Sequence, residues 1–430
     1  MTLKHPFQIV LANEAGTHLF TSVKNEISVF GLTGESKGKL LGSWIDPIDN
    51  LQPLQKQQQE KIKVLEKNAT NGEPIKVPKI PTPGPGAPPI YNYIRSLFLS
   101  HHDKYLIGIS DSDKSVIIFE IVEDDNENCL KFIKRQPFPK RPSSISIDED
   151  DDTIIVADKF GDVYTMDIIG LEVVDEKKLN PILGHVSMLS EVLITKYNGK
   201  KFIITGDRDE HIRITNYPKT YVIKDWLFGA EHKEFISILT IPSLNPSLLI
   251  SGGGDDFISL WNWYESKFIT KIDIKNLIQQ FLTDSHLPPE RFLTEESERE
   301  MSISKLLMLN HNDHQYIIIL CENTPALLLF ELIDSSSFKY IQTFTTNHSI
   351  IDITVIENTN TIIASVDNDQ DENTKLLQYY HLKEGKLFDA SISNDDVIER
   401  ISNLNQCQVE SRDDYYPLYT INTLRKRSEH

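Results

Sequence analysis

The sequence predicts an all-β fold, a β-propeller of seven blades, because one strand pattern recurs along it. In each copy, a short apolar strand is followed by a polar turn and by a second, alternating strand. The four clearest copies end on Phe119-Glu120, Met166-Asp167, Thr215-Asn216 and Trp261-Asn262, which are 47, 49 and 46 residues apart. Weaker copies end on Phe30-Gly31, Phe330-Glu331 and Tyr380-His381, which brings the number of units to seven.

Histidines and a tryptophan stand at positions that are typical of WD repeats. Trp261-Asn262 is close to the Trp-Asp signature, and His185 and His232 stand where the repeat carries Gly-His. Because buried polar groups must be paired, such a histidine can share a hydrogen-bonded chain with a turn aspartate, a strand hydroxyl and the tryptophan. The predicted chains are His232, Asp255, Ser251 and Trp261 in one blade, and His185, Asp209 and Thr205 in the blade before it, with Thr215 in the tryptophan position.

The strand rhythm divides the chain into four parts. We expect blade one and a ring-closing strand in 1–45, a disordered linker rich in Gln, Lys and Pro in 46–89, blades two to seven in 90–390, and a C-terminal extension in 391–430. The linker is assigned as disordered because proline cannot join a central strand ladder and polar, low-complexity segments bury little apolar surface. An insertion at about 275–300 is expected to hold a short helix at 275–282 and a solvated acidic loop at 295–300.

The charge and the cysteines limit the classes of function. The chain of 430 residues has 44 basic and 63 acidic residues, a net charge of −19. Such a chain repels a phosphate backbone overall, so strong binding of nucleic acid by this chain alone is not expected. Three widely spaced cysteines suit a reducing compartment, and no apolar run is long enough to span a membrane. We expect a protein of the nucleus or cytoplasm.

The stretch TGDRDEHIRITNYP at 205–218 concentrates charge in one turn. Its acids and histidine are compatible with a metal or acid–base site, or with a turn that presents side chains to another protein. Asp209 aligns with Asp255 and Asp113, each three residues before a β-branched strand residue, and this favours a structural role. Other motifs predict no catalytic or metal-binding residue: SGGGDD at 251–256 opens no helix, and DNDQDEN at 367–373 has Glu372 where a calcium loop needs glycine.

Several segments outside the repeats carry a resemblance to one family. They include PGPGAPPIYNYIRSL (83–97), KRPSSISI (140–147), VADKFGDVY (156–164), PILGHVSML (181–189), SHLPPERF (285–292) and YPLYTINTLRKRSEH (416–430). With these segments the chain resembles the WD-repeat, non-catalytic subunit of eukaryotic tRNA (guanine-N7)-methyltransferase, fungal members above all. The resemblance implies that a separate Rossmann-type subunit binds S-adenosylmethionine and methylates guanine in tRNA, forming 7-methylguanosine. This chain would then be the scaffold of a heterodimer, without a cofactor of its own.

The resemblance also implies where that catalytic subunit binds, namely on the blades of ADKFGDVY and DRDEHI. The implied contact residues are Arg213, Lys159, Arg208, Asp209, Glu210 and His211. Strand alternation puts Arg213 on the face opposite Ile212 and Ile214, so its guanidinium must reach water or a carboxylate. That carboxylate belongs either to the partner, in a bidentate pair, or to a neighbouring blade. We expect tRNA to be bound mainly through the partner, with minor phosphate contacts from the linker and Arg425 to Arg427.

Two other functions stay open from the sequence. One is a propeller adaptor for another complex, such as a ubiquitin ligase, which predicts extra helices or a docking motif beside the propeller. The other is a propeller enzyme with a site in its central channel, because a Ser–His–Asp triad is a spatial arrangement that a sequence cannot exclude.

Overall fold

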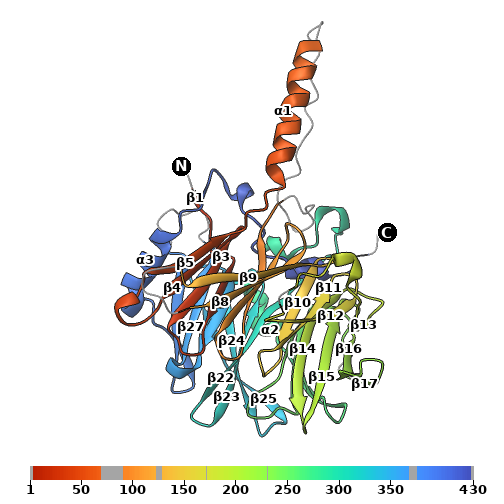
Figure 1. Cartoon of the computed structure of the whole chain (residues 1–430). Helices are drawn as coiled ribbons and strands as arrows, with labels where there is room; N and C mark the ends of the chain where they lie inside the picture. The colour runs from red at the N-terminus through yellow and green to blue at the C-terminus, as the bar shows by residue number, and fades with distance from the viewer. Residues whose placement is uncertain are drawn as a thin grey trace.

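The computed structural model describes residues 3–68, 91–122, 128–170, 172–229, 231–367 and 375–427. It confirms the predicted propeller, with seven four-stranded antiparallel sheets around a central axis (Figure 1). Each blade is one continuous meander, and all seven predicted strand endings lie on the third strand of a blade. The first strands of most neighbouring blades pack against one another and surround the axis.

The first four blades have the following strands. Blade 1 contains β2 (Ile9–Ala12), β3 (His18–Val23), β4 (Glu26–Gly31) and β5 (Leu40–Ile45). Blade 2 contains β6 (Ile94–Leu99), β7 (Tyr105–Ser110), β8 (Ser115–Ile121) and β9 (Leu130–Pro137). Blade 3 contains β10 (Pro142–Ile147), β11 (Thr153–Asp158), β12 (Asp162–Asp167) and β13 (Leu183–Gly184). Blade 4 contains β14 (Leu189–Tyr197), β15 (Lys200–Asp207), β16 (Ile212–Tyr217) and β17 (Ile223–Trp226).

The last three blades follow the same order. Blade 5 contains β18 (Ile236–Thr240), β19 (Leu248–Gly253), β20 (Phe257–Asn262) and β21 (Lys267–Asp273). Blade 6 contains β22 (Ile303–His311), β23 (His314–Cys321), β24 (Ala326–Ile333) and β25 (Ser337–Thr345). Blade 7 contains β26 (Ile350–Ile356), β27 (Thr361–Val366), β28 (Leu377–Lys383) and β29 (Lys386–Asp389).

The core lies between neighbouring blades. Alternating apolar residues of each sheet face the next sheet, as Ile204 and Ile214 of blade 4 do against Leu249 and Trp261 of blade 5. All four of these side chains are buried. Burial of apolar surface on both faces of every sheet is the main stabilising term for such a ring, and it explains why the second and third strands read as nearly continuous apolar runs.

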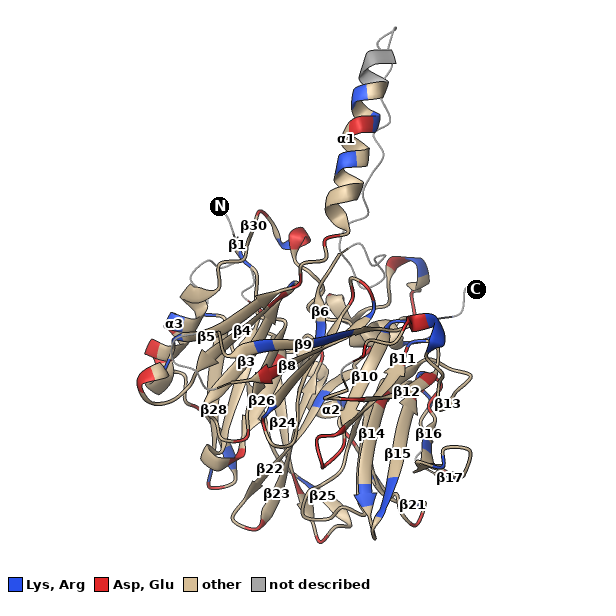
Figure 2. Ribbon diagram, in the orientation of Figure 1, with Lys and Arg blue, Asp and Glu red and all other residues tan. Residues whose placement is uncertain are grey.

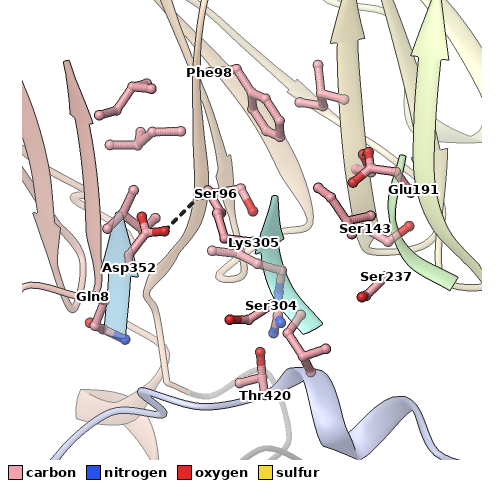
Figure 3. A pocket seen from close by; sticks show the side chains of 18 of the residues that line it. Gln8, Ser96, Phe98, Ser143, Glu191, Ser237, Ser304, Lys305, Asp352 and Thr420 are labelled. Atoms are coloured by element: carbon pink, nitrogen blue, oxygen red, sulfur yellow. Dashed lines mark hydrogen bonds and ion pairs between the residues drawn. The ribbon is translucent and has the colours of Figure 1, made fainter. Parts of the chain in front are cut away.

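A serine recurs near the start of the inner strands, where the pairing register shifts. Ser143, Ser190, Ser237 and Ser304 each lie within such an irregularity. Ser143 Oγ donates to the carbonyl of Ala157 (3.2 Å), and Ser190 Oγ donates to that of Gly206 (3.1 Å). A bulge leaves backbone groups without ladder partners, and these hydroxyls satisfy them. The serines line the axial channel, a hollow of about 530 Å³ in which Lys305 also pairs with Asp352 at 2.8 Å (Figure 3).

Two segments differ from the sequence prediction. The linker was predicted to be disordered, but Leu51–Asn68 forms helix α1, which projects from one end of the propeller (Figure 1). The segment is rich in good helix formers, and Asp49 Oδ1 accepts from the backbone N–H of Leu51 (2.9 Å) and Gln52 (3.1 Å), which caps the first turn. The rest of the predicted linker, from 69 on, lies outside the described residues. The insertion holds α2 (Lys275–Ile278), shorter than predicted, and the 3-10 turns Gln279–Phe281, Asp284–His286 and Glu290–Phe292.

The C-terminal extension returns to the N-terminus and joins the two ends of the ring. It contains α3 (Asp395–Leu404), β30 (Gln408–Val409) and the 3-10 turns Arg412–Asp414 and Ile421–Leu424. Strand β30 pairs with β1 (Leu3–Lys4), outside the seven blades. Between blades 1 and 7, Val10 N–H donates to Asp352 Oδ2 (3.1 Å) and Ala12 N–H donates to Thr354 Oγ1 (2.9 Å).

His5 holds this junction through its neutral form. The ring is fully buried, its Nδ1 lies 2.8 Å from the Pro6 carbonyl, and its Nε2 accepts from the backbone N–H of Tyr416 at 2.9 Å. An Nε2 that accepts a hydrogen bond must be unprotonated. Burial accordingly lowers the pKa of His5 to about 4.

This predicts a loss of stability in mild acid. Because the folded-state pKa lies below the ordinary value of about 6.5, the contribution of His5 is fully present above pH 6.5 and is lost as the pH falls towards 4. We expect a loss of about 2–3 kcal/mol in the free energy of unfolding by pH 4, measured by urea titration. The variant His5→Gln should be less stable at pH 8 and should lack this pH-dependent part. Parallel pH profiles for the two chains would contradict the assignment.

Candidate protein-docking surface

The hydrogen-bonded chain expected in blade 5 is present. His232 Nδ1 lies 2.8 Å from Asp255 Oδ2, and His232 Nε2 lies 3.0 Å from Ser251 Oγ. Trp261 Nε1–H donates to the same hydroxyl at 2.9 Å. All four residues are buried or nearly so, and the imidazole packs against the Trp261 ring at 6.4 Å. This chain fixes the turn between β19 and β20 to the loop that precedes the blade.

Blade 4 has the corresponding chain with a different aspartate. His185 Nε2 lies 2.9 Å from Thr205 Oγ1, as expected, but its Nδ1 lies 3.2 Å from Asp207 Oδ2. The assignment of Asp209 to this chain was therefore wrong. Blade 5 has Gly253 where blade 4 has Asp207, so only the turn aspartate can reach the histidine there. In blade 4 the carboxylate at the strand end is available, and Asp207 Oδ1 also accepts from the backbone N–H of Asp209 (2.8 Å) and His211 (3.0 Å).

Trp226 takes over the packing role of the tryptophan that blade 4 lacks. It lies on β17 directly opposite Arg213 of β16. Its ring contacts the imidazoles of His185 (5.6 Å) and His211 (5.7 Å), and the Arg213 guanidinium lies 5.6 Å from its centroid. The aromatic ring therefore comes from the fourth strand of this blade instead of the third.

Arg213 is buried, which alternation alone did not predict. It is 7% exposed, and its guanidinium donates to the Gly184 carbonyl (2.9 Å) and to Thr215 Oγ1 (3.1 Å). Burial lowers its pKa from the usual value. Within the described part of the chain it forms no ion pair with a carboxylate, so the expected alternative of an acid on a neighbouring blade is not found. A buried cation bound only to neutral acceptors is costly, and a carboxylate brought by another molecule would stabilise it.

The other residues of the DRDEHI turn face outward beside the C-terminal segment. Arg208 Nε donates to the Leu424 carbonyl at 2.6 Å, and Asp209 Oδ1 pairs with Lys426 Nζ at 2.6 Å. Glu210 is exposed with φ of 63°, a left-handed conformation that closes the turn. His211 is partly exposed and lies 3.4 Å from Asp207. The structure thus places Arg208, Asp209, Glu210 and His211 in one turn, and of these His211 shares the Trp226 ring with Arg213.

Lys159 lies on blade 3, in the turn between β11 and β12, next to the exposed Phe160. Partial burial, and then the charge of Arg141, lower its pKa. Arg141 has its own pKa lowered by burial and by Arg95, with Asp111 3.5 Å away as the nearest carboxylate. Cations that lower one another's pKa mark a local positive field in a chain that is acidic overall.

These cations surround a hollow of about 1020 Å³, hereafter the basic hollow, next to the mouth of the channel. Its described lining contains no Asp or Glu. Figure 2 shows that charged residues gather in the loops at the ends of the blades, whereas the strands are mostly uncharged. The seven cations that line the hollow are Arg95, Arg141, Lys159, Arg208, Arg291, Arg425 and Arg427.

Exposed apolar side chains concentrate on the same two blades. Of the nineteen large apolar side chains that are exposed among the described residues, nine lie between 160 and 228. Strand β13 has only 2 residues and β17 only 4, against 8 in β9, so the outer edges of blades 3 and 4 are poorly covered. Phe160, Val186 and Phe228 lie in turns at the same end as DRDEHI. A basic hollow at the same end of the propeller as a concentration of exposed apolar residues is typical of a protein-binding surface.

Over the residues that the structure describes, no three His, Cys, Asp or Glu side chains are placed to hold a metal ion. No described helix is long and apolar enough to cross a membrane.

The fold and its blade networks define the class of protein as a WD-repeat β-propeller. Two solved structures share this fold at low sequence identity. "Structure of U3-55K" matches with a TM-score of 0.56 and 12% identity over 88% of this chain and 97% of that one. "Crystal structure of RRP9 WD40 repeats" matches with a TM-score of 0.55 and 12% identity over 86% of this chain and 90% of that one.

Sequence comparison identifies the particular family. The family described as "tRNA methyltransferase TRM82 WD40 domain" matches residues 19–181 and 173–387. Relatives named "tRNA (guanine-N(7)-)-methyltransferase non-catalytic subunit TRM82" are 52% identical in Debaryomyces hansenii and 36% identical in Saccharomyces cerevisiae, each over the full length of both chains. The chain belongs to this family of non-catalytic subunits, and the resemblance seen in its motifs is confirmed.

The two turn aspartates of blade 4 should differ in their effect on stability. Asp207 is 2% exposed and accepts three hydrogen bonds, so Asp207→Ala should lower the free energy of unfolding by about 2–3 kcal/mol. Asp209 is one-third exposed and forms a surface pair, so Asp209→Ala should change it by less than about 1 kcal/mol. Urea unfolding of the two variants measures the difference, and equal losses would restore Asp209 to the structural chain.

Proposed function

We propose that this chain is the scaffold that binds and stabilises the catalytic subunit of a tRNA (guanine-N7)-methyltransferase, and that 7-methylguanosine formation in tRNA requires it. The observation that carries the proposal is the basic hollow, with seven cations and no described carboxylate in its lining. Family membership supplies the partner's identity, because a non-catalytic subunit named for a reaction requires a catalytic one. The S-adenosylmethionine and most of the tRNA-binding surface would belong to that partner, and the complex would act in the nucleus.

The surface fits a protein better than it fits RNA. The chain has a net charge of −19, so its long-range field opposes the approach of a phosphate backbone. A protein segment that carries carboxylates next to apolar side chains would satisfy both parts of the surface. Its carboxylates would neutralise Lys159 and Arg208, and its apolar side chains would cover Phe160, Val186 and Phe228.

Arg213 is a buried residue beneath the proposed docking surface and not an exposed contact residue. Its guanidinium lies under Trp226 and already donates to a carbonyl and a hydroxyl. The substitution Arg213→Glu would place a carboxylate against the Gly184 carbonyl, to which the guanidinium now donates. A loss of binding in that variant would therefore report on folding as well as on docking. Lys159, which is exposed, is the better probe of the surface.

The proposed function predicts the 7-methylguanosine content of tRNA in cells. Deletion of the gene should abolish 7-methylguanosine in tRNA, as measured by mass spectrometry, and this chain should restore it. A chain with Lys159→Glu should restore it poorly. An undiminished mark in the deletion strain would refute the proposed function.

The second prediction concerns affinity. Lys159→Glu should weaken binding of the purified catalytic subunit about 10- to 100-fold, because reversing an exposed charge costs less than the about 2–5 kcal/mol that breaking a buried charge pair costs. The matched control is Lys200→Glu, which makes the same charge change at the exposed start of β15, at the opposite end of blade 4 from the DRDEHI turn. Titration calorimetry with both variants decides the matter, and an equal affinity for the two would place the interface elsewhere.

A further inference from the structure

The last described residues, 418–427, form a segment that crosses the end of the propeller, hereafter the tail. Thr420 and Ile421 line both the axial channel and the basic hollow, so the tail separates one from the other. Figure 3 shows Thr420 on the tail ribbon facing the channel hollow. The tail then continues past blades 6 and 5 and reaches the DRDEHI turn of blade 4.

Two buried anchors fix the backbone of the tail. The Glu322 carboxylate accepts from the N–H of Ile421 (2.6 Å) and of Asn422 (2.8 Å), and the residue is 8% exposed. The Arg425 guanidinium donates to the carbonyls of Gly254 (2.7 Å) and Met301 (2.9 Å) and pairs with Glu234 at 2.7 Å. Hydrogen bonds that involve charged, buried groups are among the stronger ones in proteins.

A third anchor uses the acidic run that was expected to be solvated. Glu300 Oε1 and Oε2 accept from Arg427 at 2.9 and 2.6 Å, and Oε2 also accepts from Asn422 Nδ2 at 3.1 Å. Burial alone would raise the pKa of Glu300, but these hydrogen bonds hold it below the usual value. The tail cations Arg425 and Arg427 are therefore mostly buried in ion pairs.

The anchored tail positions the charged residues of the DRDEHI turn. Arg208 Nε donates to the Leu424 carbonyl (2.6 Å) and its Nη2 donates to the Arg425 carbonyl (3.4 Å). Lys426 Nζ holds Asp209 Oδ1 at 2.6 Å. In the described chain, Arg208 has these backbone carbonyls and no carboxylate as acceptors, so the direction of its guanidinium depends on the tail.

We propose that the tail is a permanent wall of the docking surface, and that it sets Arg208 in the position that an acidic segment of the catalytic partner recognises, while Lys426 of the tail neutralises the neighbouring Asp209. This proposal rests on the proposed function and deepens it. The tail completes the basic hollow, and every charged residue in the described lining of that hollow is a cation. The segment that occupies it is therefore acidic.

The contacts argue for a wall and against an inhibitory plug. The anchors lie on blades 5 and 6, whereas the proposed partner contacts lie on blades 3 and 4. The basic hollow keeps its volume of about 1020 Å³ with the tail in place. A partner can therefore enter the hollow without displacing the tail, and removal of the tail would take away one side of it.

The test is the affinity of the purified catalytic subunit for four forms of the full-length or shortened chain. They are the unaltered chain, a chain that ends at Tyr419, Lys426→Glu, and Arg400→Glu as the matched control. Arg400 lies on α3 in the same C-terminal extension, is about as exposed as Lys426 and forms a comparable surface pair with Asp396. Thermal unfolding of each form shows whether the propeller is intact.

We expect the shortened chain to unfold cooperatively and to lose at least tenfold in affinity, Lys426→Glu to lose severalfold, and Arg400→Glu to bind like the unaltered chain. If the shortened chain does not fold, the affinities of Lys426→Glu and Arg400→Glu for the catalytic subunit are compared with each other, and this comparison tests the tail proposal. Unaltered or tighter binding by the tail variants would overturn the tail proposal and leave the proposed function standing. Failure of the unaltered chain to bind the catalytic subunit would overturn the proposed function and the tail proposal with it.

Discussion

The described ring is closed by side-chain contacts and by the C-terminal extension, because its first and last blades are each built from one continuous segment. This constraint determines the path of the rest of the chain. Strand β30 must return to β1, and the neutral His5 ring then receives the Tyr416 backbone. From there the chain continues over the channel mouth, where Glu322 and Arg425 fix the tail. Ring closure and the shape of the candidate docking surface are thus coupled through one segment.

The propeller was predictable because its signals are local. A strand, a turn and a second strand lie within about 15 residues, and their alternation can be read directly from the sequence. The His232 chain was predictable for the same reason. The serines at 143, 190 and 237 repeat at one spacing on the inner strands, and this repeat is a second sequence signal for the blades. The predicted repeat did not include it because that repeat covers only the second and third strands of each blade.

The features that could not be predicted from the sequence depend on contacts between distant residues, or on a choice between two similar residues. Asp207 and Asp209 are both plausible turn acids, and the choice depends on the strand-end position that glycine occupies in blade 5. Trp226 reaches Arg213 from the next strand, so its role requires the register of β16 and β17. Arg208 and Leu424 are 216 positions apart, and no periodicity links them. Disorder was predicted for the α1 segment because a segment with few apolar residues buries little surface, but the helix propensity of its residues is high.

The distribution of cations explains how an acidic chain can serve an enzyme that acts on RNA. Arg425 and Arg427 are engaged with Glu234 and Glu300, and Arg95 is engaged with Asp111, so these charges stabilise the ring and offer little to a phosphate. Among the described residues, Lys159 and Arg208 form no ion pair with a carboxylate, and Arg141 shares Asp111 with Arg95; all three line the basic hollow. Elsewhere the excess of acid opposes RNA at long range. Such an arrangement favours one oriented protein contact over contact with a phosphate backbone.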